Sequence, residues 1–155
     1  MATLKISDLS VGDWVSFDTA YLTVEGDDIA TAFVKKVQQP ARIKSILGDQ
    51  DLIFVEVENE DDFCTIYLKV EHIRPIPITA EILAKNGFER STSQFIVYHT
   101  DKVWISYDKP SETWSVTMYI NDVTSNLHAN IKYIHNLQHA LRLAGVDKEI
   151  VMPNK

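Results

Sequence analysis

Two histidines whose spacing suits metal binding are the first residues that could do chemistry. In the stretch 135–139 (HNLQH), two imidazoles stand four positions apart, so they share one face of a helix and can chelate a metal. The metalloprotease form of this motif needs a glutamate as general base, where this chain has Asn136. A third ligand such as His128 would require a particular fold. We therefore interpret the pair as hydrogen-bonded histidines and predict no metal and no cofactor.

Other catalytic patterns lack support in the sequence. The acidic turns at 25–28 and 58–62 lack the alternating oxygen ligands of an EF-hand loop and are interpreted as solvated turns. No glycine-rich phosphate loop and no Gly-x-Ser-x-Gly motif occur, and the chain has 5 glycines in all. The single cysteine, Cys64, lies in an apolar run and is interpreted as a sheet or core residue. We predict that the protein is not an enzyme.

Aromatic and basic side chains are the candidate binding residues. Strand alternation turns Trp104 away from Val103 and Ile105; burial under a helix is the favoured interpretation, and exposure would make it a hot spot for a protein partner. Tyr98 and Tyr119 belong to the same aromatic-rich region. A small ligand such as a nucleotide would instead need basic residues at a cleft, for which the candidates are Arg42, Lys44 and Arg74.

Composition and charge limit the classes of partner. The 155 residues are 45% hydrophobic and 24% charged, which is typical of a globular protein. The net charge of −7 falls entirely in residues 1–78, while residues 79–155 are neutral. An acidic half repels phosphate backbones, so we expect no nucleic acid partner. No apolar run is long enough to span a membrane and the first residues lack a signal-peptide core, so we expect a cytoplasmic protein.

The first half of the sequence predicts short strands. Alternating or β-branched runs occur at 11–17, 41–46, 52–57 and 64–70, separated by turns rich in Gly, Asp and Asn, with a tight turn at 70–73. Residues 21–34 predict a hairpin, or alternatively a helix over 29–37, and Pro40 is expected to end that unit. The order predicts an SH3-like small β-barrel over residues 1–77.

The second half, residues 78–155, predicts a helix, a meander and a second helix. Thr79 suits an N-cap and Gly87 a C-terminal cap, so a helix is expected over 80–86. Strands are expected at 95–99, 103–107 and 113–120, with a short fourth strand at 123–129, and then a helix from about 130 to Gly145. The prediction is an α+β protein whose two-layer second half docks on the barrel through the stiff Pro75-Ile76-Pro77 join.

Three segments of the chain resemble a known family. These are the opening at 8–15 (DLSVGDWV), the stretch 75–88 (PIPITAEILAKNGF) and the stretch 131–150 (IKYIHNLQHALRLAGVDKEI). They are similar to a family of small proteins of uncharacterised activity from Bacteroides-type gut bacteria, their phages and their mobile elements. The resemblance covers most of the chain and departs at about residues 18–38. It implies a phage or mobile-element accessory protein that acts inside a bacterium, and it implies no activity.

These observations favour a non-enzymatic protein that acts through protein–protein interaction, with modulation of a host factor or defence as one candidate role. One alternative is a protein that binds or sequesters a small, nucleotide-type ligand. Another is a structural component of a virion. The sequence predicts a protein partner first, because an acidic barrel and an aromatic sheet both suit protein contacts.

Overall fold

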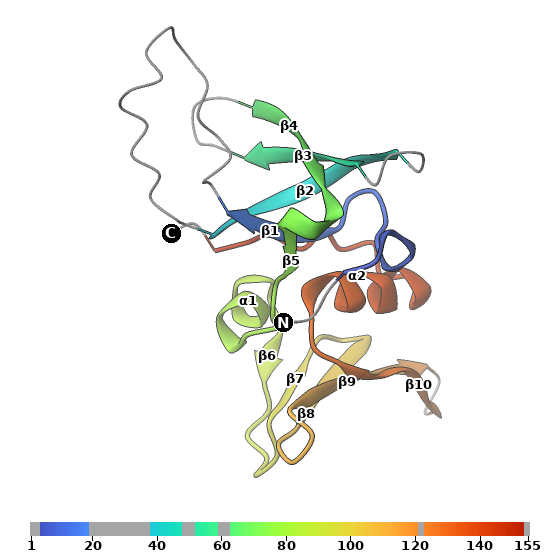
Figure 1. Cartoon of the computed structure of the whole chain (residues 1–155). Coiled ribbons are helices and arrows are strands. Elements are labelled where there is room, and N and C mark those ends of the chain that lie inside the picture. Colours follow the sequence, from blue (N-terminus) through green and yellow to red (C-terminus); the bar gives the residue numbers. More distant parts are fainter. Residues whose placement is uncertain (1–3, 19–37, 48–51, 59–62, 121–122, 154–155) are drawn as a thin grey trace, which may run out of the picture. The chain divides into compact units, whose positions relative to one another are not determined.

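The computed structural model describes residues 4–18, 38–47, 52–58, 63–120 and 123–153 (Figure 1). The chain divides into two compact units, residues 1–76 and 77–155, and each is described by itself. The predicted boundary lay one residue later, between residues 77 and 78. The predicted hairpin or helix over residues 21–37 falls outside the described residues. Each unit contains an antiparallel sheet, and both α-helices of the described residues belong to the second unit, so the predicted α+β class is confirmed.

The first unit is one antiparallel sheet of five strands in the order β4-β3-β2-β1-β5. A 3-10 turn, η1 (Ile6–Asp8), precedes the sheet, and a second one, η3 (Val70–His72), lies between β4 and β5 where a tight turn was predicted. The strands are β1 (Trp14–Asp18), β2 (Gln38–Leu47), β3 (Leu52–Glu58), β4 (Phe63–Lys69) and β5 (Ile73–Pro75). In the described residues β4 and β5 are the two edges, so no closed barrel is formed.

Alternation along the strands places the core of this unit on one face of the sheet. Val15 and Phe17 of β1 lie opposite Ala41 and Gln39 of β2, and Phe17 also lies opposite Ile73 of β5. Side chains two positions apart point to the same face of a strand, so the apolar ones gather there. The buried cluster consists of Leu4, Leu9, Val15, Phe17, Ala41, Ile43, Leu68 and Ile73.

Pro40 lies inside β2, although the sequence predicted that it would end the preceding segment. Its partner in β1 is Ser16, while the pairing of β2 with β3 reaches only as far as Arg42. Among the described strands, β2 therefore has a neighbour on one side only at Pro40. A proline lacks a backbone N–H, and such a position tolerates it because one side of the strand needs no hydrogen-bond donor.

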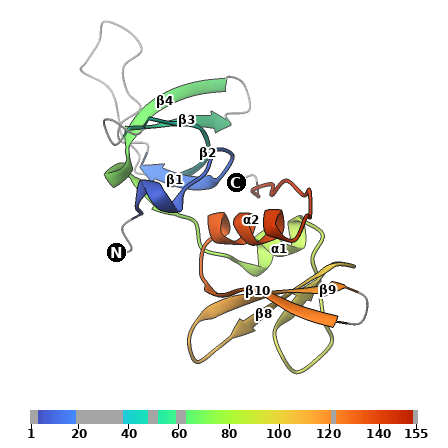
Figure 2. The ribbon, with the colours of Figure 1, turned by 90° about the vertical axis from the view of Figure 1, so that its right-hand side faces the viewer.

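The second unit is a five-stranded antiparallel sheet in the order β10-β9-β8-β7-β6, with two helices on one of its faces (Figures 1 and 2). The helices are α1 (Ala80–Lys85) and α2 (Ile134–Leu143). The strands are β6 (Glu89–Arg90), β7 (Val97–His99), β8 (Val103–Asp108), β9 (Thr113–Ile120) and β10 (Val123–Ile131).

Local capping sets the limits of α1 as the sequence predicted. The Thr79 hydroxyl accepts a hydrogen bond from the Ile82 amide at 3.3 Å. At the other end, the Phe88 amide donates to the Leu83 carbonyl at 3.0 Å, across Gly87 with φ of 71°. This is a Schellman motif, in which a left-handed residue lets the chain turn back and satisfy the last carbonyls. Gly145 and Val146 end α2 in the same way, with φ of 65° and a 3.0 Å bond to Leu141.

Several elements of the second unit differ from the prediction, among them β7, which begins at Val97 and not at residue 95. The last strand continues to Ile131, which pairs with Trp114, so α2 begins at Ile134 and not near residue 130. The strand β6 was not predicted, because two exposed charged residues carry no strand pattern. None of the helices in the described ranges has the length and apolar character needed to cross a membrane.

Candidate functional site

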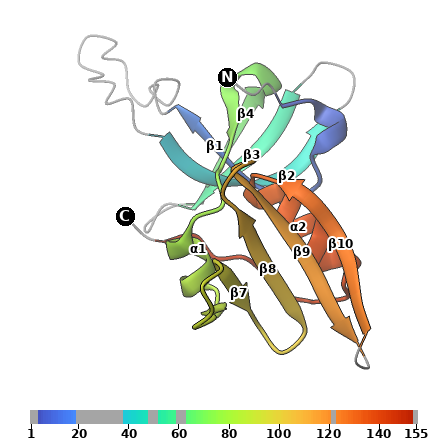
Figure 3. The same cartoon turned by 90° about the horizontal axis from the view of Figure 1, so that it is seen from below.

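The candidate site is the face of the second sheet that is turned away from the helices (Figure 3). Strand register defines it, because directly opposed residues share a face. His99 lies opposite Trp104, Trp104 opposite Thr117, and Tyr119 opposite Thr124. We call this surface the open face, and its central members are Val97, His99, Trp104, Ser106, Ser115, Thr117, Tyr119, Thr124 and Asn126. The register also places Glu89, opposite His99, and Asp108, opposite Thr113, at the margins of this face.

The residues that alternate with the open face form the core of the unit. Val103, Ile105 and Val116 are fully buried, and Trp114 is 8% exposed, as predicted for a core residue. The helices cover one face of the sheet (Figure 2), and α2 contributes buried residues such as Leu137 to the core. This pattern fixes the side of the sheet on which Trp104 lies. The open face is therefore a consequence of strict alternation in β8 and β9.

Trp104 is the centre of the open face and is 47% exposed. The interpretation favoured from sequence, burial under a helix, is wrong, because the helices cover the other face. The Trp104 ring stacks on His99 with centroids 5.4 Å apart and planes at 28°. Tyr119, which is 45% exposed, lies on the same face. Stacking holds the indole in one orientation, so it is a preformed surface for a partner.

A shallow hollow of about 240 Å³ crosses the open face. Its lining combines an indole, a phenol ring, an isopropyl group and hydroxyls, from Val97, Trp104, Ser106, Thr117, Tyr119 and Thr124. Four strands contribute to it, so its shape depends on the register of the whole meander. Sequence reasoning found Trp104 and Tyr119 and missed the residues beside them. The short predicted turns could have indicated the pairing of Trp104 with Thr117.

The centre of the open face has no charged side chain, although 24% of the residues in the chain are charged, and the carboxylates of Glu89 and Asp108 stand at its margins. Its polar groups are hydroxyls, one amide and one imidazole. The Thr117 hydroxyl and the Asn126 side-chain oxygen lie 3.3 Å apart across β9 and β10. Burying such a surface against a partner costs less desolvation free energy than burying one that bears Lys or Glu.

Tyr98, the third aromatic candidate, does not belong to the open face. It alternates with Val97 and His99, lies opposite Ile105 and is 6% exposed. Its ring packs near Trp114, with centroids 6.0 Å apart. Because it is held in the interior, Tyr98 is a packing residue in this structure and offers little surface to a partner.

The three basic candidates of the first unit stand on two sides of β1. Arg42 lies opposite Trp14, with its guanidinium carbon 5.8 Å from the centre of the indole. Arg74 lies opposite Ser16 on the other side of β1, and its guanidinium donates to the backbone carbonyls of Glu71 and Ile73. Lys44 is exposed on β2. The Arg74 guanidinium is thus hydrogen-bonded to nearby backbone carbonyls. This weakens the hypothesis that the three basic residues bind one anionic ligand together.

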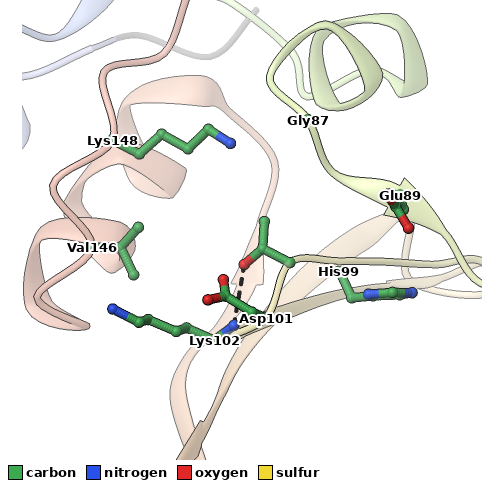
Figure 4. A pocket seen from close by; sticks show the side chains of 8 residues that line it. Gly87, Glu89, His99, Asp101, Lys102, Val146 and Lys148 are labelled. Atoms are coloured by element: carbon green, nitrogen blue, oxygen red, sulfur yellow. Dashed lines mark hydrogen bonds between the residues drawn. The ribbon is translucent and has the colours of Figure 1, made fainter.

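A second hollow, of about 470 Å³, is lined in part by His99 of the open face (Figure 4). The turn between β7 and β8 supplies Asp101 and Lys102, β6 supplies Glu89, and the segment after α2 supplies Lys148. The Lys148 ammonium lies 5.1 Å from the centre of the Phe88 ring. Two ammonium and two carboxylate groups balance each other, so this hollow has no net charge with which to select an anion.

The histidine pair of α2 lies partly in the interior. His135 is 2% exposed and stacks on Tyr133, with centroids 5.9 Å apart and planes at 10°. His139 meets it edge-on at 6.2 Å. Within the described ranges, no three or more His, Cys, Asp or Glu side chains gather in a way that could hold a metal ion.

Of the predicted site residues, the structure brings together Trp104 and Tyr119 on the open face and places Tyr98 in the core of the same unit. The three basic candidates belong to the first unit. The chain matches no protein-family model, no curated protein and no solved structure. The geometry of the open face is therefore the basis for a functional proposal.

Proposed function

We propose that this protein is a non-enzymatic binding protein that recognises a protein partner through the open face. The observation that supports the proposal is the half-exposed Trp104, stacked on His99, in the uncharged central part of the open face. Tryptophan and tyrosine are enriched among the residues that contribute most to binding energy, and charged residues are depleted at the centre of interfaces. A partner with an uncharged contact surface fits this chemistry.

The arrangement also lowers the cost of association. Trp104 and Tyr119 are held on strands, so little side-chain freedom is lost when a partner covers them. Hydroxyl groups of Ser106, Thr117 and Thr124 surround the rings and can hydrogen-bond to a partner backbone. The face therefore combines aromatic anchors with adaptable polar contacts, and it needs no cofactor.

Capture from a bacterial lysate tests the proposal, using wild type, Trp104→Ala, Thr117→Arg and Leu143→Ala. Thr117→Arg places a charge in the middle of the open face. Leu143, which is 71% exposed on α2, is the matched control for loss of an exposed apolar side chain. We expect wild type and Leu143→Ala to retain one protein at a stoichiometric level and the two open-face variants to lose at least about tenfold in affinity.

Two results would contradict the proposal. One is recovery of nucleic acid alone. The other is a partner that binds Trp104→Ala and Thr117→Arg as tightly as wild type, because the interaction would then use another surface. Circular dichroism and melting curves of both variants show whether the fold is intact, and substitutions at such exposed positions change stability by about 0.5 kcal/mol or less.

For the first unit we propose an SH3-like relationship. Its strand order places β5 beside β1 after a meander of β1 to β4, and one 3-10 turn joins β4 to β5. These features support a small, strongly curved sheet of that type. Such folds serve many unrelated functions, so the fold alone adds nothing to the choice of partner.

Binding of a small ligand is the second candidate, and the hollow beside Lys102 and Lys148 is the observation that favours it. Its balanced charges suit a zwitterion better than a nucleotide. A thermal-shift screen distinguishes the two functions, because a ligand of this hollow stabilises wild type and not Lys148→Ala. The phage or mobile-element setting and a role in the virion remain proposals. Mass spectrometry of purified particles tests the latter.

A further inference from the structure

The two edges of the second sheet differ in length and in charge. At one edge, β6 has two residues, Glu89 and Arg90, both charged and exposed. At the other edge, β10 has nine residues, Val123–Ile131, and none is charged and none is proline (Figure 3). Natural sheets protect their edges with short strands, charges or prolines, because an open edge pairs readily with another strand. The edge at β6 is protected in this way, and the edge at β10 is not.

The backbone groups that β10 offers can be assigned from its neighbours. The Tyr119 amide donates to the Lys102 carbonyl at 3.1 Å, so the backbone polar groups of Tyr119 point toward β8. Tyr119 and its partner Thr124 are therefore a non-hydrogen-bonded pair between β9 and β10. The amide and carbonyl of Thr124 must then point away from β9. By alternation the same holds for Asn126, whereas Val123 and Ser125 bond to β9.

Irregularities limit the part of β10 that can pair. The register with β9 is regular from Val123 to Asn126 and shifts between Asn126 and His128, and again before Ile131. Asn130 has φ of 60°, which is a turn-like conformation that interrupts a ladder. The usable edge is therefore the segment Val123–Asn126. Thr124, Ser125 and Asn126 are all exposed there.

We propose that this segment pairs with the same segment of a second copy of the chain, in an antiparallel arrangement about a two-fold axis at Ser125. In this register Thr124 of each copy lies opposite Asn126 of the other, and each such pair exchanges both of its backbone hydrogen bonds. The outward-facing backbone amides and carbonyls of Thr124 and Asn126 are then all hydrogen-bonded to the second copy. The two open faces become parts of one continuous sheet surface.

Charge favours a second copy over a foreign strand. At a two-fold axis every residue near the axis meets its own kind, so a charged residue there would face a like charge. The segment has no charge, and residues 79–155 are neutral although the whole chain carries −7. The assembly also closes at two copies, because β6 at the far edge is short and charged and does not continue the sheet. This inference does not depend on the proposed partner at the open face.

Sedimentation velocity of the full chain across micromolar concentrations tests the dimer, with Thr124→Pro and Thr124→Val compared with wild type. Proline removes the outward amide and leaves the bonds between β9 and β10 in place. Thr124→Val keeps the amide. We expect wild type and Thr124→Val to form dimers and Thr124→Pro to remain monomeric. A monomeric wild type, or a dimer that persists in Thr124→Pro, overturns the proposal.

Charged substitutions at Ser125, on the two-fold axis, test the pairing register between the two copies. They do not depend on the folding of the proline variant. Ser125→Lys and Ser125→Glu each place like charges directly opposite each other, about 5 Å apart at the Cβ atoms. Each variant alone should be monomeric, and an equal mixture should recover the dimer. Failure of the mixture to associate while wild type is dimeric overturns the two-fold pairing at Ser125, and so does a dimer in either variant alone.

Discussion

The indole of Trp104 stacks on the imidazole of His99 with ring centroids 5.4 Å apart, on the face of the sheet that the helices leave uncovered. The two residues are directly opposed on β8 and β7. Their contact joins two strands on the outer side, as Val103 and Ile105 join the sheet to the helices on the inner side. The same alternation thus produces a core and an aromatic surface from neighbouring residues.

Trp104 should account for the fluorescence that a neutral quencher reaches. Trp14 and Trp114 are 3% and 8% exposed, whereas Trp104 is about half exposed. We predict that acrylamide quenches one component of the emission in wild type and that Trp104→Phe removes this component. Phenylalanine keeps the stacking on His99, so stability should change by less than about 0.5 kcal/mol. Strong quenching that persists in Trp104→Phe would place another tryptophan at the surface.

Elements that depend on nearby residues were predictable from the sequence. The caps at Thr79, Gly87 and Gly145 each require only a few adjacent residues, and all three are formed as expected. The core position of Trp114 follows from alternation within a single strand. Such signals need no knowledge of distant parts of the chain.

Features that depend on distant partners were not predictable. Alternation shows that Trp104 and Trp114 lie on opposite faces, and it does not show which face the helices cover. The extent of β10 depends on the pairing of Ile131 with Trp114, seventeen positions away. Arg74 was a plausible ligand-binding residue until its guanidinium was seen to donate to the Glu71 carbonyl. Tertiary packing decides such cases, because propensity and pattern leave them open.

The two helix-ending glycines provide a matched pair for a stability experiment. Gly87→Ala and Gly145→Ala both force a Cβ into the left-handed region, which costs roughly 1–2 kcal/mol. At Gly87 the new atom would also lie 3.3 Å from the Lys148 ammonium, whereas at Gly145 nothing lies within 4 Å. Lys148 would have to move from its place over Phe88.

We therefore predict that denaturant unfolding shows a larger loss for Gly87→Ala than for Gly145→Ala, by about 0.5–1 kcal/mol, the size of an exposed cation–π interaction. In a Lys148→Met background the two glycine substitutions should lower the free energy of unfolding by the same amount. If the difference persisted there, strain in the backbone of α1 would be its source and the lysine would have no part in it.

The N-cap of α1 should contribute measurably to the stability of the second unit. The Thr79 side chain satisfies the Ile82 amide, which has no partner within the helix. Thr79→Ala should lower the free energy of unfolding by about 1 kcal/mol, and Thr79→Ser should retain most of it. The control is Ala84→Ser, an exposed substitution within α1 that leaves the cap unchanged. Equal losses in Thr79→Ser and Thr79→Ala would show that the hydroxyl contributes nothing.

Asn86 ties the C-terminal segment to α1, and its replacement by aspartate should make stability depend on pH. The Asn86 amide group is buried and donates to the carbonyls of Ile82 and Val151 at 2.8 and 2.9 Å, and its oxygen accepts from the Val151 amide at 2.8 Å. Asn86→Asp keeps the acceptor and loses both donors. Its carboxylate would face two carbonyl oxygens in the interior, which raises the pKa of the new group above its unfolded value of about 3.9.

A raised pKa means that the folded state of Asn86→Asp binds more protons than the unfolded state between the two pKa values. Its stability relative to wild type should therefore fall as the pH rises from about 4 to 7. Near pH 7 we expect a loss of at least about 2 kcal/mol, since a buried charge is left without donors. Asn86→Ala, which removes all three hydrogen bonds and adds no titrating group, should show the same loss at both pH values. Melting temperatures of the two variants, each measured against wild type at both pH values, give the comparison. A deficit in Asn86→Asp that does not change with pH would show that the aspartate reaches solvent and that the C-terminal segment is not held against α1.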